Sequence, residues 1–406
     1  MDDGLPAYIG FAGLWRLELS GMAPERVGPL LEARVARDPG NAAAMMDIAT
    51  LLILTLRPEN REIAFAMQAR ALDIQQVYRL AAAREPAGVK VLAIASTGDM
   101  TAVTPLDCLL EDSDVELLML YVRPGRAMPA ELPDHDLVFV AVGESGANRP
   151  ALEQLRQFAR SSPRPVLNLP GQILKLSRDS VSGALRRIPG VAMPLTASVD
   201  REMLARVGRS EIPLAQVLDE GAFPVIARPV DSQGGKDLAW LDGPTAVTAY
   251  LDATAPEAFF ISRFIDYSDA DGLFRKYRVV MIDGRPFACH MAISRNWMIH
   301  YVNADMDLDA GKREEEARFM ATFDAGFAAR HERALRGIDA AMGLDYYAID
   351  CAETAQGSLL VFEVDTAMLV HAMDPADLYP YKQPQMRKVF AAFRAMLERR
   401  RNAGRK

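Results

Sequence analysis

The stretch YYAIDCAETAQGSLLVFEVDT, residues 346–366, decides how the rest of the sequence is interpreted. It holds two runs rich in β-branched and aromatic residues joined by a polar loop, which predicts two antiparallel strands. Residues two apart on a strand point to the same face, so Glu363 and Asp365 project side by side from an apolar strand. Asp350 ends the first run, and a hairpin of this length can bring it beside them. Because like charges so placed repel, something positive is expected between them.

Three carboxylates without His or Cys predict a metal site of oxygen ligands. Such a site suits Mg²⁺ or Mn²⁺, which bind carboxylates together with phosphate oxygens. The alternative is that Asp350 caps a turn while Glu363 and Asp365 face solvent. The apolar residues that flank the acids on both strands favour the metal site, and a divalent cation of this kind implies a nucleotide.

Composition and charge exclude several classes of protein. The 406 residues are 50% hydrophobic and 25% charged, as in globular proteins of two or three domains. The formal net charge of −8 argues against a nucleic-acid-binding protein. The three cysteines have neither disulfide-framework nor zinc-site spacing, and Cys289 and Cys351 are expected in the core. The acidic N-terminal stretch lacks a signal-peptide pattern and the apolar runs are short, so we expect a cytoplasmic protein outside the membrane.

Residues 1–86 are predicted to be helical, because Ala, Leu, Met and Arg dominate and Pro and Gly fall at plausible breaks. The stretch DPGN, 38–41, predicts a helix end followed by the cap of the next helix. Two similar stretches, around Asp38 and Asp73, have a spacing close to that of a tetratricopeptide repeat. Two interpretations stay open: a helical hairpin that packs on the rest of the protein, and a repeat that binds a peptide or carrier protein.

Residues 87–170 have the pattern of an α/β domain with a parallel, doubly wound sheet. No GxGxxG follows the first strand, which excludes a standard dinucleotide site. The predicted strands are 89–96, 115–122, 135–144 and 165–170, with an amphipathic helix at 149–162.

Residues 171–400 are predicted to form a second α/β domain. Its predicted elements include a strand–loop–strand at 223–241, a hairpin at 274–294 that turns at Asp283–Gly284, and a long helix over 314–343. The loop of 223–241 supplies a partner for the acids, because glycine backbone N–H groups can approach phosphates without hindrance from Cβ. Alone it equally fits a plain hairpin loop; its order relative to the acidic cluster favours phosphate binding.

The order of these motifs over roughly residues 88–395 resembles the ATP-grasp superfamily. The similar branch is that of the carboxylate–amine ligases, such as D-alanine–D-alanine ligase, glutathione synthetase and the ribosomal-protein glutamate ligase. FPVIARPVDSQGGKD looks like the phosphate strand and loop, FFISRFID like the hinge that holds adenine, and YAIDC…LLVFEVDT like the metal-binding hairpin. The resemblance implies a small α/β domain at 87–170 and an ATP-grasp domain at 171–400.

The resemblance further implies chemistry and site residues. A substrate carboxylate takes the γ-phosphoryl group of ATP, and an amine then displaces phosphate from the acyl phosphate, leaving an amide and ADP. Arg278 steadies the transferring group, and Asp350, Glu363 and Asp365 hold Mg²⁺ or Mn²⁺. The implied nucleotide-binding residues are Arg228, Ser232, Gly234, Gly235, Lys236, Arg263, Phe264, Ile265 and Lys276.

The stretch HMAISRNWMIHYVNADM, 290–306, lies where the family places the acceptor. Arg295 could clamp a substrate carboxylate, and His300 could take a proton from the attacking amine. His290, Trp297 and Asn303 complete the predicted substrate side. The alternative is that these side chains are packing residues. An amino acid or peptide is the implied substrate, and a homodimer is one implied assembly.

Several positions differ from the usual family residues. Arg228 and Ser180 stand where lysines are usual, Arg263 where the hinge holds a glutamate, and Lys276 where an aspartate precedes the family arginine. Asp365 replaces an asparagine. Two hypotheses follow: a divergent active ligase, or a nucleotide-binding but inactive relative that serves as a scaffold, with the helical N-terminus as its interaction arm.

Overall fold

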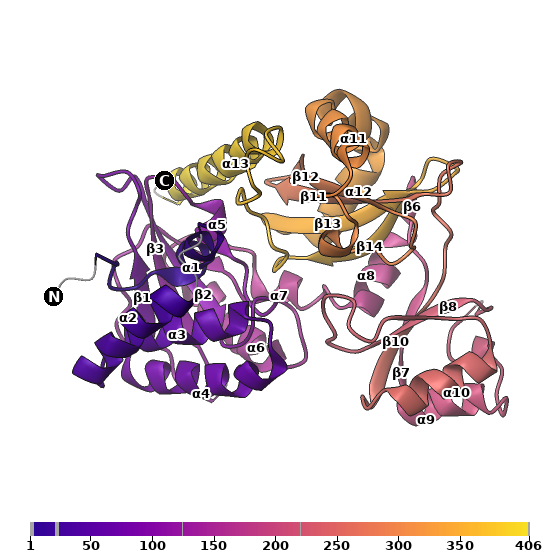
Figure 1. The fold of residues 1–406 in the computed structure, drawn as a ribbon, viewed down its shortest axis with the longest axis horizontal. Helices are drawn as coiled ribbons and strands as arrows, with labels where there is room; N and C mark the ends of the chain where they lie inside the picture. The colour runs from indigo at the N-terminus through magenta and orange to yellow at the C-terminus, as the bar shows by residue number, and fades with distance from the viewer. Residues whose placement is uncertain (1–3, 21–23, 124, 220, 405–406) are drawn as a thin grey trace. The chain divides into compact units, whose positions relative to one another are not determined.

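The computed structural model shows an α/β protein that divides into two compact units (Figure 1). It describes residues 4–20, 24–123, 125–219 and 221–404, so the first three residues of the acidic N-terminal stretch lie outside it. Unit 1 comprises Met1–Leu174, Leu344–Tyr347 and Thr366–Lys406, and unit 2 comprises Lys175–Gly343 and Ala348–Asp365. The division of the sequence into three domains stays a prediction.

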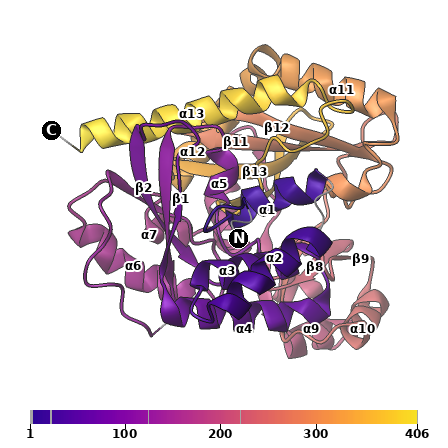
Figure 2. The same ribbon diagram turned by 60° about the vertical axis from the view of Figure 1, so that its left-hand side comes forward.

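Unit 1 begins with a group of helices that pack on one another, drawn in indigo in Figure 2. Asn41 caps α3 by accepting a hydrogen bond from the Ala44 N–H, which confirms the predicted helix end and cap at 38–41. Leu14, Leu31 and Leu51 belong to the shared core of these helices. The likeness to a tetratricopeptide repeat stays a prediction. The helices are α1 (Gly10–Leu19), α2 (Pro24–Arg37), α3 (Ala42–Leu54) and α4 (Pro58–Ile74).

The prediction that helix extends to about residue 86 is wrong at β1 (Val77–Leu80). This short strand pairs antiparallel with β3 (Val115–Val122) at the edge of the sheet. Tyr78 is fully buried and its ring meets those of Tyr8 and Tyr121. A β-branched and aromatic run that covers an open sheet edge gains pairing and burial that a longer α4 would lose.

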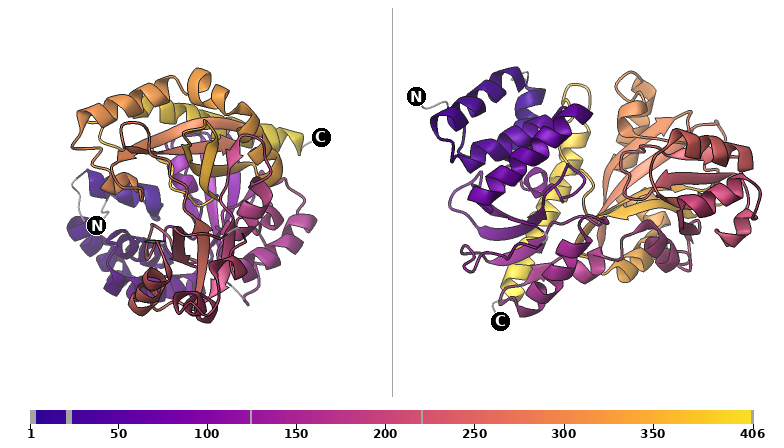
Figure 3. Two further views of the ribbon diagram at one scale, coloured as in Figure 1. Left: turned by 90° about the vertical axis from the view of Figure 1, so that its right-hand side faces the viewer. Right: turned by 90° about the horizontal axis from the view of Figure 1, so that it is seen from below.

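The predicted parallel pairing is confirmed for β2, β3, β4 and β5, and the antiparallel β1 at the edge makes the sheet mixed, with strand order β1-β3-β2-β4-β5. The long C-terminal helix α13 (Lys382–Ala403), yellow in Figure 3, packs against β2 and β4. Within the described ranges, no helix combines the length and the hydrophobicity that a membrane span needs. The other elements of this part are β2 (Val89–Ser96), β4 (Leu137–Val140), β5 (Val166–Leu167), α5 (Leu106–Leu109), α6 (Arg149–Ser161) and α7 (Pro170–Ile173).

Two aspartates, the buried Asp47 and the half-buried Asp107, hold the start of α1 in place. The N-cap residue of α1, Ile9, offers no side-chain cap. Instead, Asp47 of α3 accepts the N–H groups of Ile9 and Gly10 at 2.9 and 3.0 Å, and Asp107 of α5 accepts that of Ala12 at 2.8 Å. A carboxylate at a helix N-terminus satisfies free N–H donors and interacts favourably with the helix dipole. Tertiary contacts therefore replace the missing local cap.

Unit 2 contains two sheets. The first has the order β7-β10-β8-β9, with α9 and α10 supplying part of a core that includes Leu204, Val247 and Phe259. The second has the order β12-β11-β13-β14-β6. The elements are α8 (Arg178–Leu185), β6 (Val191–Ala192), β7 (Thr196–Asp200), α9 (Arg201–Gly208), η1 (Leu214–Gln216), β8 (Val225–Pro229), β9 (Ala239–Leu241), α10 (Pro244–Ala253), β10 (Ala258–Arg263), β11 (Phe274–Ile282), β12 (Arg285–Ser294), η2 (Tyr301–Asn303), β13 (Tyr346–Glu353) and β14 (Leu359–Asp365).

The prediction of one helix over 314–343 is wrong, because the segment is broken. It forms α11 (Ala310–Ala321), a π-helical turn η3 (Asp324–Ala328) and α12 (Glu332–Met342). Phe323 and Phe327 are both buried, and their rings stack at 5.7 Å. A π-turn changes the helical register, so both rings stay on the core side, and the interior Gly326 lowers the cost of the break.

Asp47 makes the stability of the protein depend on pH. Burial raises the pKa of this carboxyl from 3.8 to about 7, against the opposing effect of the two backbone N–H groups. Since the folded-state pKa lies above the unfolded one, the stabilising contribution is complete below about pH 4 and is lost as pH rises towards 7.

We therefore expect wild type to lose on the order of 2 kcal/mol of unfolding free energy, relative to Asp47→Asn, between pH 5 and pH 7. Denaturant unfolding at both pH values measures this difference. Asp73→Asn, which alters an exposed aspartate of α4, is the control. The prediction would be contradicted if the unfolding free energies of wild type and Asp47→Asn changed by the same amount between pH 5 and pH 7.

Candidate functional site

The charged side chains of unit 2 gather on adjacent strands, and two of these strands are bulged at those residues. Asp350 of β13 lies directly opposite Glu363 of β14, and the register shifts immediately after Asp350. The predicted hairpin of β11 and β12 is also confirmed, and its register shifts immediately after Arg278. A bulge re-aims the side chains beside it, and bulges are common next to functional sites.

Asp350 is a buried carboxylate that two cations neutralise. Its side chain is 3% exposed. Arg278 donates to both carboxylate oxygens, at 2.7 and 3.0 Å, and the Lys276 ammonium lies 2.7 Å from Oδ2. Burial disfavours the charged form, but Arg278 and Lys276 outweigh it and hold the pKa of Asp350 well below its usual range. The expected positive charge is therefore present, supplied by protein side chains.

Glu363 is neutralised by Arg178, a residue that our sequence analysis did not single out. Arg178 of α8 donates to Glu363 and to the Phe362 carbonyl. Burial raises the pKa of Glu363, but Arg178 and then Arg228 bring it below its ordinary value. The signal was available: a cation is usual near Ser180, and Arg178 stands two residues earlier. Ser180 itself only accepts a hydrogen bond from Ser177.

Arg228 forms no direct ion pair with a carboxylate among the described residues, although the charge of Glu363 acts on it. Its guanidinium donates to the hydroxyl and the carbonyl of Ser232, at the start of the predicted phosphate loop. Burial and the neighbouring Arg178 lower the pKa of Arg228 to about 10. A half-buried guanidinium so placed favours an added anion, since an anion would offset both the desolvation and the repulsion.

The two glycines of the predicted phosphate loop adopt a left-handed backbone conformation, which favours glycine. Gly234 and Gly235 have φ of +63° and +72°. A Cβ at Gly235 would lie 2.5 Å from the His300 Nε2, so glycine lets the loop meet this histidine. Burial and Lys276 lower the pKa of His300. The predicted catalytic His300 therefore lies next to the predicted phosphate loop. Lys236, which belongs to the same loop, is exposed.

The predicted hinge is a strand end followed by aromatic contacts. The Phe264 N–H donates to the Pro224 carbonyl, and its ring lies between Trp240 and Trp297, at 6.5 and 5.8 Å. The structure thereby brings the predicted substrate residue Trp297 to the predicted nucleotide residue. Arg263 is exposed and Ile265 is half-buried.

The remaining predicted acceptor residues are only partly brought together. The His290 ring contacts Tyr301, whose hydroxyl donates to the fully buried Glu316. Asn303 accepts the His300 N–H within a capping box, which is a structural role. Arg295 is exposed.

The chemistry of the acids fits a hard cation, but their arrangement differs from the predicted three-ligand set. Asp350 and Glu363 are ionised oxygen donors facing one another across a hairpin. Each is neutralised by a side-chain cation, so a metal ion would have to exchange with Lys276, Arg278 or Arg178. In the ranges described above, no three His, Cys, Asp or Glu side chains form a group that could hold a metal. The role of Asp365 stays a prediction.

Comparison with known proteins shows a likeness to solved ligase structures. The sequence matches no family model and no curated protein. D-alanine–D-alanine ligase from Bacillus anthracis complexed with ATP is 12% identical over 78% of this chain and 99% of that one, with a TM-score of 0.47. VanG D-Ala:D-Ser ligase from Enterococcus faecalis is 12% identical over 76% of this chain and 99% of that one, with a TM-score of 0.46. A RimK domain ATP-grasp protein from Sphaerobacter thermophilus is 16% identical over 76% of this chain and 99% of that one, with a TM-score of 0.42.

Removing the Asp350 charge should destabilise unit 2. Asp350→Asn leaves Arg278 and Lys276 buried without compensation, which costs roughly 3–5 kcal/mol. Adding Lys276→Met to that variant should restore part of the loss, because one uncompensated cation is removed. Denaturant unfolding measures both effects.

The matched control is Glu332→Gln, which breaks the exposed pair of Glu332 with Arg336 on α12. An exposed pair of this kind contributes at most about 1 kcal/mol. If Asp350→Asn costs no more than the control, the buried carboxylate does not carry the structural role assigned to it.

Proposed function

We propose that this protein is an ATP-dependent ligase that joins the carboxylate of an amino acid or peptide to an amine, with release of ADP and phosphate. The observation that carries the proposal is Arg228: a half-buried guanidinium beside a glycine loop, with a lowered pKa and no carboxylate partner among the described residues. Together with Arg178, Lys276 and Arg278 it forms a cationic cluster suited to polyphosphate.

The proposed reaction has two steps, and this chain's residues would act in each. In the first, a substrate carboxylate oxygen attacks the γ-phosphorus, the bond to the β-phosphate oxygen breaks, and ADP leaves. Arg228 and Arg278 would offset the charge on the transferring group. In the second, the amine attacks the acyl carbon and phosphate leaves. His300 would take the proton from the amine, because a lowered pKa keeps its ring neutral near pH 7.

Mg²⁺ is part of the proposal, and Asp350 with Glu363 would hold it. When bound, such an ion neutralises the phosphate oxygens of the nucleotide. The cations that now pair with the two acids would then be available to the phosphates. The predicted aromatic hinge at Phe264 would receive the base, and the cytoplasm stays the predicted location.

A second candidate function is a nucleotide-binding protein without ligase activity. It is favoured by Lys276, because its ammonium holds Asp350 at 2.7 Å and so competes with a metal ion. The two candidates differ in turnover: both bind ATP, and only the ligase releases ADP when a carboxylate and an amine are supplied.

The test is titration calorimetry with ATP and Mg²⁺, followed by an assay for ADP release with mixtures of amino acids and peptides. Arg228→Met should weaken ATP binding at least tenfold, since it removes one desolvated phosphate contact. Arg285→Met, which removes an exposed arginine of β12, should leave binding unchanged. ATP binding without ADP release would favour the second candidate, and binding that Arg228→Met leaves intact would overturn the site.

A further inference from the structure

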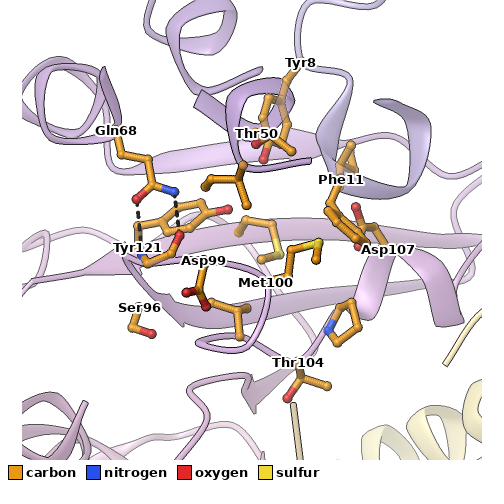
Figure 4. A pocket seen from close by; sticks show the side chains of 16 residues that line it. Tyr8, Phe11, Thr50, Gln68, Ser96, Asp99, Met100, Thr104, Asp107 and Tyr121 are labelled. Carbon is orange, nitrogen blue, oxygen red and sulfur yellow. Dashed lines mark hydrogen bonds between the residues drawn. The ribbon is translucent and has the colours of Figure 1, made fainter. Parts of the chain in front are cut away.

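Unit 1 contains a cavity of about 80 Å³ between the N-terminal helices and the sheet (Figure 4). Its walls come from α1, α3 and α4, from the loop after β2, and from the neighbouring strands β1 and β3. It shares no residue with the cationic cluster of unit 2. The helices lie outside the stretch 88–395 that carries the resemblance to the ATP-grasp ligases, whereas the loop after β2 and strand β3 lie within it.

The loop that lines the cavity is held in one conformation. The Gln68 side chain of α4 donates to the Gly98 carbonyl at 3.0 Å and accepts the Gly98 N–H at 3.2 Å (Figure 4). The Asp99 carboxylate accepts from the backbone and hydroxyl of Thr101, and Arg61 lies 2.7 Å from its other oxygen. A site fixed in this way loses little conformational entropy when a ligand binds.

Three polar side chains at the cavity, those of Thr50, Ser96 and Asp99, offer hydrogen-bond acceptors to a ligand. The hydroxyls of Thr50 and Ser96 donate to the carbonyls of Met46 and Ala102, so each presents only lone pairs to a ligand. Asp99 is a carboxylate and accepts only. Thr104 Oγ1 is buried and has no hydrogen-bond partner among the residues that the structure describes. A buried polar atom left unpaired costs free energy, which a suitable ligand would recover.

Both the charge of the cavity and its aromatic surface favour a cationic ligand. Its lining residues include Asp99 and Asp107 but no Lys, Arg or His. Arg61, which pairs with Asp99, has a side chain that is 59% exposed and does not line the cavity. Tyr8, Phe11 and Tyr121 place aromatic rings around the space, and such rings attract cations as well as apolar groups.

We propose that this cavity binds a small organic cation: a primary amine with a short apolar or aromatic body. The ammonium would donate to Asp99 and to the hydroxyl oxygens of Ser96 and Thr104, and the body would lie against Phe11, Met100 and Tyr121. A molecule that presents mainly acceptors, or a negative charge, would meet lone pairs and acids instead. The inference is independent of the proposed ligase chemistry.

The experiment is titration of the full chain with benzylamine, and with benzyl alcohol and benzoate as its neutral and anionic counterparts, followed by NMR or calorimetry. We expect saturable binding of benzylamine, binding at least tenfold weaker for the alcohol, and none for benzoate. Asp99→Asn should weaken benzylamine binding at least tenfold, and Thr104→Val two- to tenfold, as loss of one hydrogen bond predicts.

Thr104→Val keeps the test decisive, because removing an unpaired hydroxyl should leave the free protein as stable as wild type or more so. The matched control for Asp99→Asn is Asp73→Asn, which breaks an exposed aspartate–arginine contact of α4 outside the cavity and should change the affinity less than twofold. Absence of saturable benzylamine binding, equal binding of the alcohol or benzoate, or an Asp99→Asn variant that binds like wild type would overturn the proposal.

Discussion

The buried charge of Asp350 is the constraint on which the second sheet of unit 2 depends. An unpaired carboxylate could not be buried at this position without a large desolvation penalty. Arg278 and Lys276 remove the penalty by taking both of its oxygens. These cations stand on β11, and the acid stands on the adjacent strand β13. The charge of Asp350 is therefore neutralised only when β11 and β13 pair.

The same principle explains why the neighbouring charges have the partners they have. Glu363 lies opposite Asp350, and without Arg178 the two carboxylates would repel one another across the hairpin. Arg228 then stands beside Arg178 with no acid of its own among the described residues. A cluster in which acids are saturated and one arginine is left over is ready to accept an anion. This imbalance, and not the number of acids, is what supports the proposed phosphate chemistry.

Unit 1 shows a related use of a buried and a half-buried carboxylate, with a different outcome. Asp47 and Asp107 accept backbone N–H groups at the start of α1, so each acid is stabilised by dipoles and not by a counter-ion. Dipoles offset burial less completely than the paired cations do around Asp350. The pKa of Asp47 is accordingly raised, whereas that of Asp350 is lowered. The contributions of these two buried acids to the unfolding free energy therefore change with pH in opposite directions.

Local pattern determined much of this protein by itself. Strands such as 89–96 and 115–122 were predictable because hydrophobic β-branched runs have few other stable arrangements, and Asp283–Gly284 was predictable because its turn needs positive φ at both residues. The sequence also indicated the acids, the glycine loop and Arg278, since each residue type is one that the proposed phosphate site would use.

Only the tertiary structure decided which charges meet. Lys276 pairs with Asp350, and Arg178 with Glu363, because bulges and strand order re-aim side chains that are far apart in sequence. The strand at 77–80 and the break in the helix at 324–328 likewise arose from an open sheet edge and from ring packing, which no local propensity encodes. The residue types came from the sequence, and their partners came from long-range packing, because a buried charge is satisfied by whatever the fold places beside it.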